Sequence, residues 1–127
     1  MGGIVVTDVC VGLEIYADPL FVKVLINLLD NAVRHGGTRL TTIRFSYRKD
    51  GDFLVVTCAD DGDGIEESEK TRLFTQGFGK NTGLGLFLVR EILLITDITI
   101  RENGVPGTGA RFEITVPPGG FRFSGRM

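Results

Sequence analysis

Two asparagines and a basic pair recur along one predicted helix at a spacing that suits cation and phosphate binding. Asn27, Asn31 and Arg34 are four and three residues apart, which places them on one helix face, and His35 follows directly. An amide oxygen is a suitable hard ligand for Mg²⁺, and arginine or histidine can meet phosphate oxygens. Asparagine is a poor residue inside a helix, because its amide competes for backbone hydrogen bonds. The stripe therefore indicates either a site for a hydrated cation and phosphates or a face that is merely exposed to solvent.

Two glycine-rich polar segments follow further along the chain. The first, Asp60-Asp61-Gly62-Asp63-Gly64-Ile65, comes directly after an apolar strand, and its glycines let the backbone approach a flat ligand. In the second, Gly83 and Gly85 open a predicted helix, where backbone N–H groups bind phosphate. A calcium loop of the EF-hand type is disfavoured, because that loop needs helices on both sides and the preceding segment is a strand. Both segments favour a nucleotide.

Two common nucleotide motifs are absent. A P-loop would need a serine or threonine after Lys80, where Asn81 stands, and a glycine at the position of Phe74. The dinucleotide fingerprint fails because Glu67 and Leu88 occupy the positions of its last glycine. Each glycine pair is weak by itself, so the signal lies in the order of these pairs after the asparagine helix.

The elements that must position these residues are typical of an α/β (α+β) two-layer sandwich. Asp18-Pro19 signals a helix start, Gly36-Gly37 its end, and Asp50-Gly51 a hairpin. We expect a mixed, mostly antiparallel sheet of about five strands with helices on one face. The tail after Pro118 is expected to lack regular structure. The expected elements are extended segments at 4–6 and 11–16, a helix from 18–19 to about 35, strands at 40–48, 53–59, 97–102 and 110–116, a short helical piece near 66–73 and a buried helix at 84–95.

Composition narrows the function classes. The chain of 127 residues has 43% hydrophobic residues, 18 glycines and a net charge of −2, which fits one folded domain over 1–127 without a basic field for nucleic acid. No apolar stretch approaches the ~20 residues of a membrane span, and no signal peptide is visible, so we expect a cytoplasmic domain without direct membrane contact. One histidine and two separated cysteines make no zinc pattern, and Cys58 is expected to be a buried apolar residue.

Taken together, these motifs resemble the ATP-binding catalytic domain of sensor histidine kinases, within the superfamily of gyrase, heat-shock chaperone, histidine kinase and mismatch-repair ATPases (the Bergerat-type fold). The resemblance runs from about residue 13 to 117 and rests on five elements in the family's order. They are Asn27-Leu-Leu-Asp-Asn31-Ala (asparagine box), Asp60-x-Gly62-x-Gly64-Ile65 (first glycine box), Leu73-Phe74-Thr-Gln-Gly-Phe78 (phenylalanine box), Gly83-Leu84-Gly85-Leu86 (second glycine box) and Gly107-x-Gly109-x-x-Phe112.

The resemblance implies a role for each matching position. Asn31 would be the Mg²⁺ ligand, and Asp60 would accept a hydrogen bond from the adenine amino group. Residues from about 66 to 82 would form a lid over ATP. The remaining implied nucleotide contacts are Asn27 beside the metal ligand, Arg34, His35 and Lys80 near the phosphates, Gly62, Gly64 and Ile65 along the base, and Gly83, Leu84, Gly85 and Leu86 around the triphosphate. The family's usual threonine after the last glycine is replaced by Ala110, and Gly79-Lys80 stands where the phenylalanine box usually has an arginine.

The same resemblance implies phosphoryl transfer rather than hydrolysis. In hydrolytic branches a glutamate stands four residues before the metal asparagine, but here that position is Asn27, a poor general base. The expected enzyme is a protein-histidine kinase whose catalytic residues are Asn31, Asn27 and Lys80. It would transfer the γ-phosphoryl group to a histidine on a dimerisation domain absent from this chain, in cis or in trans, and signal to a response regulator. Two alternatives stay open: an anti-sigma-type serine kinase, or a noncatalytic nucleotide-binding interaction module.

Overall fold

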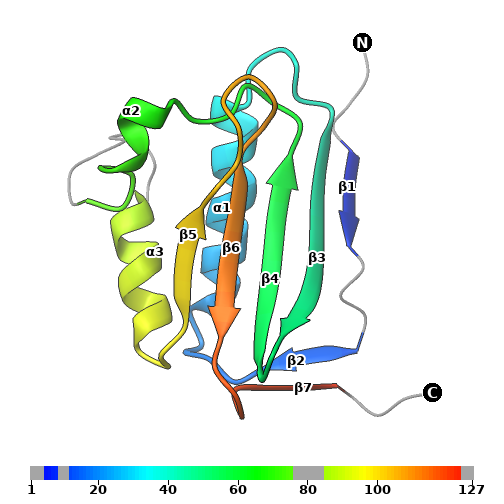
Figure 1. Cartoon of the computed structure of the whole chain (residues 1–127), viewed down its shortest axis with the longest axis vertical. Helices are drawn as coiled ribbons and strands as arrows, with labels where there is room; N and C mark the ends of the chain where they lie inside the picture. The colour runs from blue at the N-terminus through cyan, green and yellow to red at the C-terminus, as the bar shows by residue number, and fades with distance from the viewer. Residues whose placement is uncertain (1–4, 9–11, 76–84, 124–127) are drawn as a thin grey trace.

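The computed structural model describes residues 5–8, 12–75 and 85–123 of the chain. A five-stranded sheet in the order β1-β3-β4-β6-β5 forms one layer, and α1 and α3 lie together on one of its faces (Figure 1). The elements are β1 (Val5–Asp8), β2 (Leu13–Ile15), α1 (Phe21–His35), β3 (Thr42–Asp50), β4 (Phe53–Asp60), α2 (Glu67–Lys70), α3 (Gly85–Leu94), β5 (Thr99–Glu102), β6 (Arg111–Val116) and β7 (Phe121–Phe123).

The strand directions confirm the mixed, mostly antiparallel sheet expected from the sequence. β1 pairs with β3 in parallel, and the three other neighbours in the sheet pair antiparallel. The hairpin between β3 and β4 turns at Gly51, whose φ of +61° is a conformation that favours glycine. The antiparallel pairing of β6 with both β4 and β5 brings the end of β4 and the β5–β6 loop to the same end of the sheet.

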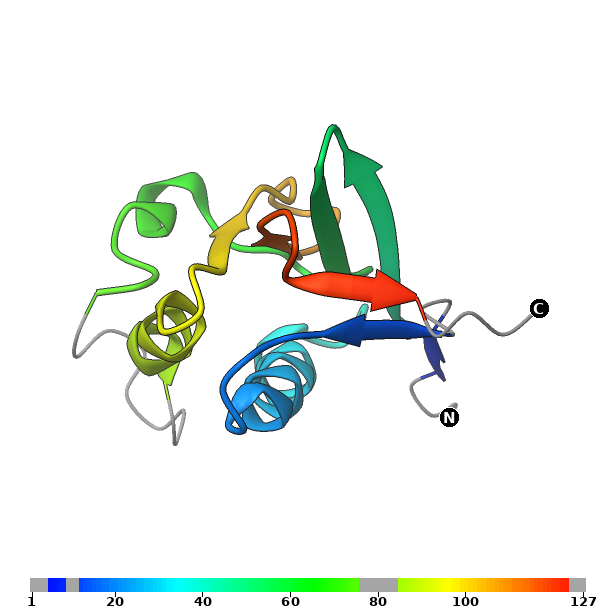
Figure 2. The ribbon, with the colours of Figure 1, turned by 90° about the horizontal axis from the view of Figure 1, so that it is seen from below.

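The C-terminal tail forms a strand, so the expectation of no regular structure after Pro118 is wrong. β7 pairs antiparallel with β2 in a second sheet, seen beside the start of α1 in Figure 2. Phe121 is half-buried against the core, and the Phe123 ring lies 5.5 Å from that of Tyr47. The short tail is ordered by these tertiary contacts, which a local sequence pattern does not contain.

Helix α1 begins at Phe21, two residues later than the Asp18-Pro19 signal suggests. Asp18 instead holds the turn before the helix: its Oδ1 accepts the Leu20 N–H at 2.8 Å and its carbonyl oxygen accepts the Phe21 N–H at 2.8 Å. The helix ends as expected, with Gly37 in the left-handed conformation at φ +76°.

The core lies between the helices and the inner face of the sheet. Its fully buried large side chains come from both layers, and their burial supplies the main driving force for this arrangement. They are Val24 and Leu28 of α1, Val89 and Leu93 of α3, Ile43, Leu54, Ile114 and Val116 of the sheet, and Ile98. None of the helices that the structure describes is long and apolar enough to cross a membrane.

Candidate functional site

A cavity of about 330 Å³ opens at one end of the molecule, where the end of α1, the end of β4, α2, the start of α3 and the β5–β6 loop meet. This volume is within the range of small-molecule sites. Its polar lining contains two carboxylates, an amide and an imidazole among mostly apolar walls. The lining residues are Asn31, Ala32, His35, Gly36, Asp60, Gly64, Ile65, Glu69, Leu73, Leu86, Ala110 and Phe112.

Asp60 presents a carboxylate whose orientation is fixed by the backbone. Its Oδ1 accepts hydrogen bonds from the N–H groups of Gly62 at 2.9 Å and Ala110 at 3.1 Å. No residue that the structure describes donates to its other oxygen, Oδ2. Because both donors are main-chain groups, they fix the orientation of the Asp60 carboxylate. Its Oδ2 is thereby left as an acceptor beside the apolar walls of the cavity.

The glycines of three loops allow the backbone segments around the cavity to pack closely. A Cβ atom on Gly62 would lie 2.5 Å from the carbonyl oxygen of Gly36, and one on Gly109 would overlap the Asp60 carbonyl. Gly64 has a φ of +76° and lines the cavity itself. Gly62 does not line the cavity, and its backbone packs instead against Gly36 at the end of α1.

The two asparagines of α1 form a connected pair. The Nδ2 atom of Asn31 donates to Oδ1 of Asn27 at 3.2 Å, and Asn27 is only 8% exposed. The stripe is therefore not a solvent face at Asn27. Asn31 lines the cavity, and because its amide nitrogen is engaged by Asn27, its carbonyl oxygen is the atom left to bind a hard cation.

Arg34 and His35 have different surroundings. His35 lines the cavity. Arg34 does not: its Nε lies 2.7 Å from Oδ2 of Asp30 in an exposed ion pair on the helix surface. The structure thus brings His35, but not Arg34, to the cavity wall.

Asp61, the neighbour of Asp60, holds the loop to the start of β3. Its Oδ1 accepts the N–H groups of Thr41 at 2.8 Å and Thr42 at 2.9 Å, and its Oδ2 accepts the Thr41 hydroxyl. These hydrogen bonds lower the pKa of Asp61 to about 2. The bond from the Thr41 hydroxyl has the largest effect, followed by those from the N–H groups of Thr41 and Thr42. Asp61 is therefore a structural carboxylate, whereas Asp60 faces the cavity.

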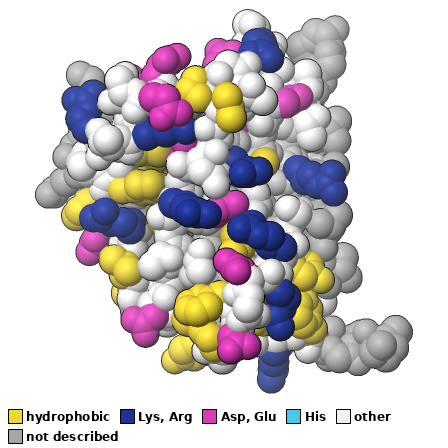
Figure 3. Space-filling model, in the orientation of Figure 1, with side chains coloured by type: hydrophobic (Ala, Val, Ile, Leu, Met, Phe, Trp, Pro, Cys, Tyr) yellow, Lys and Arg dark blue, Asp and Glu magenta, His cyan; other side chains and the backbone are white. Residues whose placement is uncertain are grey.

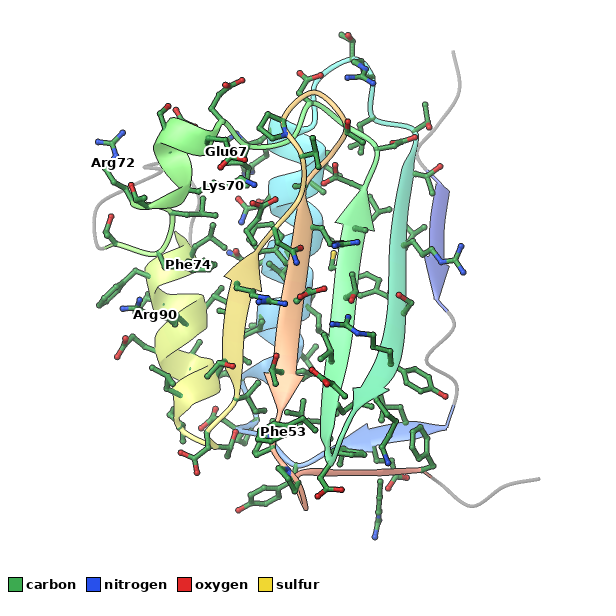
Figure 4. All side chains as sticks on the ribbon, viewed as in Figure 1. Phe53, Glu67, Lys70, Arg72, Phe74 and Arg90 are labelled. Carbon is green, nitrogen blue, oxygen red and sulfur yellow. The ribbon has the colours of Figure 1, made fainter. Side chains whose placement is uncertain are left out.

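Helix α2 brings one residue to the cavity wall, Glu69, that none of the sequence motifs marked. Glu69 and Leu73 line the cavity from this side, and Phe112 closes it from β6, packing edge-on against Phe74 at 6.3 Å. Figure 4 shows Lys70 pointing from α2 toward the β5–β6 loop, while Arg72 points away. Glu69 has no distinguishing local pattern, since it is one of several acids in a short polar helix.

Of the remaining residues predicted to contact the nucleotide, Gly85 and Leu86 lie at the start of α3. Gly85 begins the helix with a φ of +78°, and Leu86 lines the cavity, as does Ile65 of the first glycine box. Lys80, Gly83 and Leu84 lie outside the described residues. Within the described ranges no three His, Cys, Asp or Glu side chains gather as a metal cluster, so a cation here would depend on amide and ligand oxygens.

Cys58 is the buried apolar residue that the sequence predicted. It is 5% exposed on β4, two residues before Asp60. Burial, with a smaller effect from the charge of Asp60, raises the pKa of the Cys58 thiol to about 12. The thiol is therefore protonated and unreactive at neutral pH.

The chain is similar to ATPases and sensor kinases among known proteins. Residues 17–120 match the family described as histidine kinase-, DNA gyrase B-, and HSP90-like ATPase. The chain is 37% identical over 103 residues to the alginate biosynthesis sensor protein KinB of Pseudomonas aeruginosa, covering 75% of this chain and 17% of KinB. It is 32% identical over 120 residues to the sensor histidine kinase RcsC of Escherichia coli, covering 87% of this chain and 12% of RcsC.

Among solved structures, the ATP binding domain of PrrB from Mycobacterium tuberculosis superimposes with a TM-score of 0.73 and 25% identity. This match covers 93% of the present chain and 82% of that one. The chain thus spans a small part of its full-length relatives but most of a single solved domain.

Proposed function

This chain belongs to the family of histidine kinase-, DNA gyrase B-, and HSP90-like ATPases, and from that premise we propose that its cavity binds ATP as the catalytic domain of a sensor histidine kinase. The observation that carries the proposal is the carboxylate of Asp60. Oδ1 is held by two backbone N–H groups, so Oδ2 is the acceptor left for the adenine amino group. The base would lie among the apolar walls given by Ile65, Leu73 and Phe112.

The polar side of the cavity would receive the phosphates. Asn31 is the residue that fits a Mg²⁺ ion, since its amide nitrogen is engaged by Asn27 and its oxygen remains for a hard cation. Bound Mg²⁺ would neutralise charge on the β- and γ-phosphates. His35 lies on the same helix, one turn further along, where it can meet a phosphate oxygen. We assign Gly85 to the phosphate side by its place at the start of α3, and Lys80, Gly83 and Leu84 to it by sequence alone.

Transfer to a protein acceptor is favoured over ATP hydrolysis because residue 27 is an asparagine and not a general base. A buried amide that hydrogen-bonds Asn31 cannot take a proton from water. The acceptor we propose is a histidine on a dimerisation domain outside residues 1–127, with a response regulator downstream. His35 is not that acceptor, because it lines the nucleotide cavity itself.

Calorimetric titration with ATP and GTP tests the base assignment. Asp60→Asn keeps the shape of the side chain, but its amide oxygen is needed by Gly62 and Ala110, which turns an N–H group toward the adenine amino group. We expect ATP affinity to fall at least about tenfold, as for a lost hydrogen bond with an unpaired buried donor. Asp60→Ala should abolish binding. Unchanged ATP affinity in a folded Asp60→Asn protein would contradict the assignment.

Transfer is tested by mixing the chain with a histidine-bearing dimerisation domain and labelled ATP. An acid-labile phosphoprotein product is expected. An acid-stable product would instead indicate a serine acceptor, and binding of ATP without any transfer would indicate a noncatalytic module.

A further inference from the structure

The face of the main sheet opposite the helices carries a regular set of arginines. Strand register puts Arg44 and Arg111 on either side of Ala59, and Arg101 beside Glu113. Arg48 belongs to the same face, opposite Val55. We call the surface formed by Arg44, Arg48, Arg101, Arg111 and Glu113 the arginine face. None of the described helices covers it, and Figure 3 shows Lys and Arg side chains spread across it.

Glu113 organises these arginines. Its side chain is 4% exposed. Its Oε1 lies 2.9 Å from Nε and 2.7 Å from Nη2 of Arg101, and its Oε2 accepts a hydrogen bond from Nη1 of Arg48 at 3.2 Å. Burial of the carboxylate would raise its pKa, but these hydrogen bonds and charges outweigh burial and lower the pKa of Glu113. The guanidinium groups are therefore held in place while half or more of each arginine side chain stays exposed (51% for Arg48, 66% for Arg101).

The residues between the arginines are small, which leaves room for a ligand. Ala59, Thr57 and Thr115 occupy the register positions between the charged side chains. A cleft of about 270 Å³ lies beside Arg48 and Arg101, lined also by Thr99 and Thr115. The guanidinium N–H groups of Arg48 and Arg101 that do not bind Glu113 remain as charged donors for carboxylates beside this cleft.

The charge of this face contrasts with that of the whole chain. Four arginines stand against two acids, Asp50 and Glu113, on a chain of net charge −2. We propose that the arginine face is a docking surface for an acidic segment of a partner protein, whose Asp or Glu side chains pair with Arg48 and Arg101. The inference does not depend on the nucleotide site, since neither arginine lines that cavity.

A protein fits this face better than a nucleic acid or a membrane. Phe53 lies on the same face at the end of the hairpin and is 45% exposed (labelled in Figure 4). An exposed aromatic residue next to arginines is the composition of a protein interface. Because Glu113 already orders two arginines, binding loses little side-chain entropy.

Fluorescence anisotropy with a labelled glutamate-rich peptide tests the proposal. The peptide should bind the wild-type chain weakly and more weakly as salt rises. Arg48→Gln/Arg101→Gln should lower the affinity at least about tenfold. The matched control is Arg122→Gln, which removes an exposed, ion-paired arginine from β7 and should change the affinity less than about twofold. ATP binding by both variants serves as the check on folding, and the single variants replace the double one if it fails.

Three outcomes would overturn the proposal. The first is no measurable binding of the peptide. The second is an equal loss in Arg122→Gln, which would mean that only total charge matters. The third is tighter, arginine-face-dependent binding of a single-stranded DNA oligonucleotide or of phosphatidylserine vesicles than of the peptide.

Discussion

The Nζ atom of Lys70 on α2 lies 3.0 Å from Oε1 of Glu102 on β5 and 2.5 Å from the carbonyl oxygen of Gly104. The Glu102 side chain is 1% exposed, and its Oε2 accepts the N–H groups of Gly104 and Arg111. Burial lowers the pKa of Lys70, but Glu102, together with the charge of Glu67, raises it above 10.5 overall. A buried ion pair thus connects the α2 wall of the cavity to the β5–β6 loop.

Removing the lysine should destabilise the domain, because Glu102 then stays buried without its cation. We expect Lys70→Met to lower the free energy of unfolding by about 1–3 kcal/mol, measured by urea denaturation. Lys70→Met/Glu102→Gln should recover most of the loss, since glutamine keeps an acceptor for Gly104 and Arg111. An unchanged urea midpoint in the single variant would show that the pair contributes nothing.

Gly62→Ala should disturb the packing of two backbone segments. The added Cβ atom would lie 2.5 Å from the Gly36 carbonyl oxygen and 2.7 Å from its Cα atom. We expect a loss of about 2–3 kcal/mol in unfolding free energy, together with weaker ATP binding. Gly51→Ala is the comparison: its Cβ would meet nothing within 4 Å, and only the φ of +61° is unfavourable, at about 1 kcal/mol. A larger loss for Gly51→Ala would contradict the steric argument.

The pKa of Asp61 predicts a specific acid sensitivity. Because the folded pKa of about 2 lies below the model-peptide value of 3.8, the charged form is favoured by folding. Its contribution to stability is present above pH 3.8 and is lost as the pH falls toward 2. Asp61→Asn should flatten that part of the stability curve, measured by denaturation between about pH 2 and 5. Thr41→Val, which removes one donor, should flatten it partly. A curve for Asp61→Asn parallel to that of the wild type would contradict the assignment.

We expect Asn31 and Asn27 to have different roles: Asn31 binds Mg²⁺, and Asn27 stabilises the fold and orients Asn31. Asn31→Ala is expected to weaken the Mg²⁺ dependence of ATP binding more than Asn27→Ala does, because Asn31 lines the cavity. Asn27→Ala should instead cost more stability, about 1–2 kcal/mol, because Asn27 is buried and hydrogen-bonded. Calorimetric titration with and without Mg²⁺ and thermal unfolding measure the two effects. Equal effects of both variants on both measurements would contradict this division.

The local sequence pattern alone was sufficient to predict much of the fold and to identify the motifs and their order. Helix periodicity and the Gly36-Gly37 stop located α1, and Asp50-Gly51 located the β3–β4 hairpin, because these signals depend on neighbours in the chain. The asparagine and glycine boxes identified the family for the same reason: close approach and positive φ require particular residue types at fixed spacing.

Only the tertiary structure decided which of those residues face the cavity. Asn27 and Arg34 share a helix face with Asn31, yet one is buried and the other pairs with Asp30 at the surface. Glu69 lines the cavity although no local motif marks it, because α2 is placed by a contact 32 residues away in sequence, between Lys70 and Glu102. The order of β7 and the arginine face likewise depend on strand register, which sets distant side chains on one surface through pairings that no local spacing encodes.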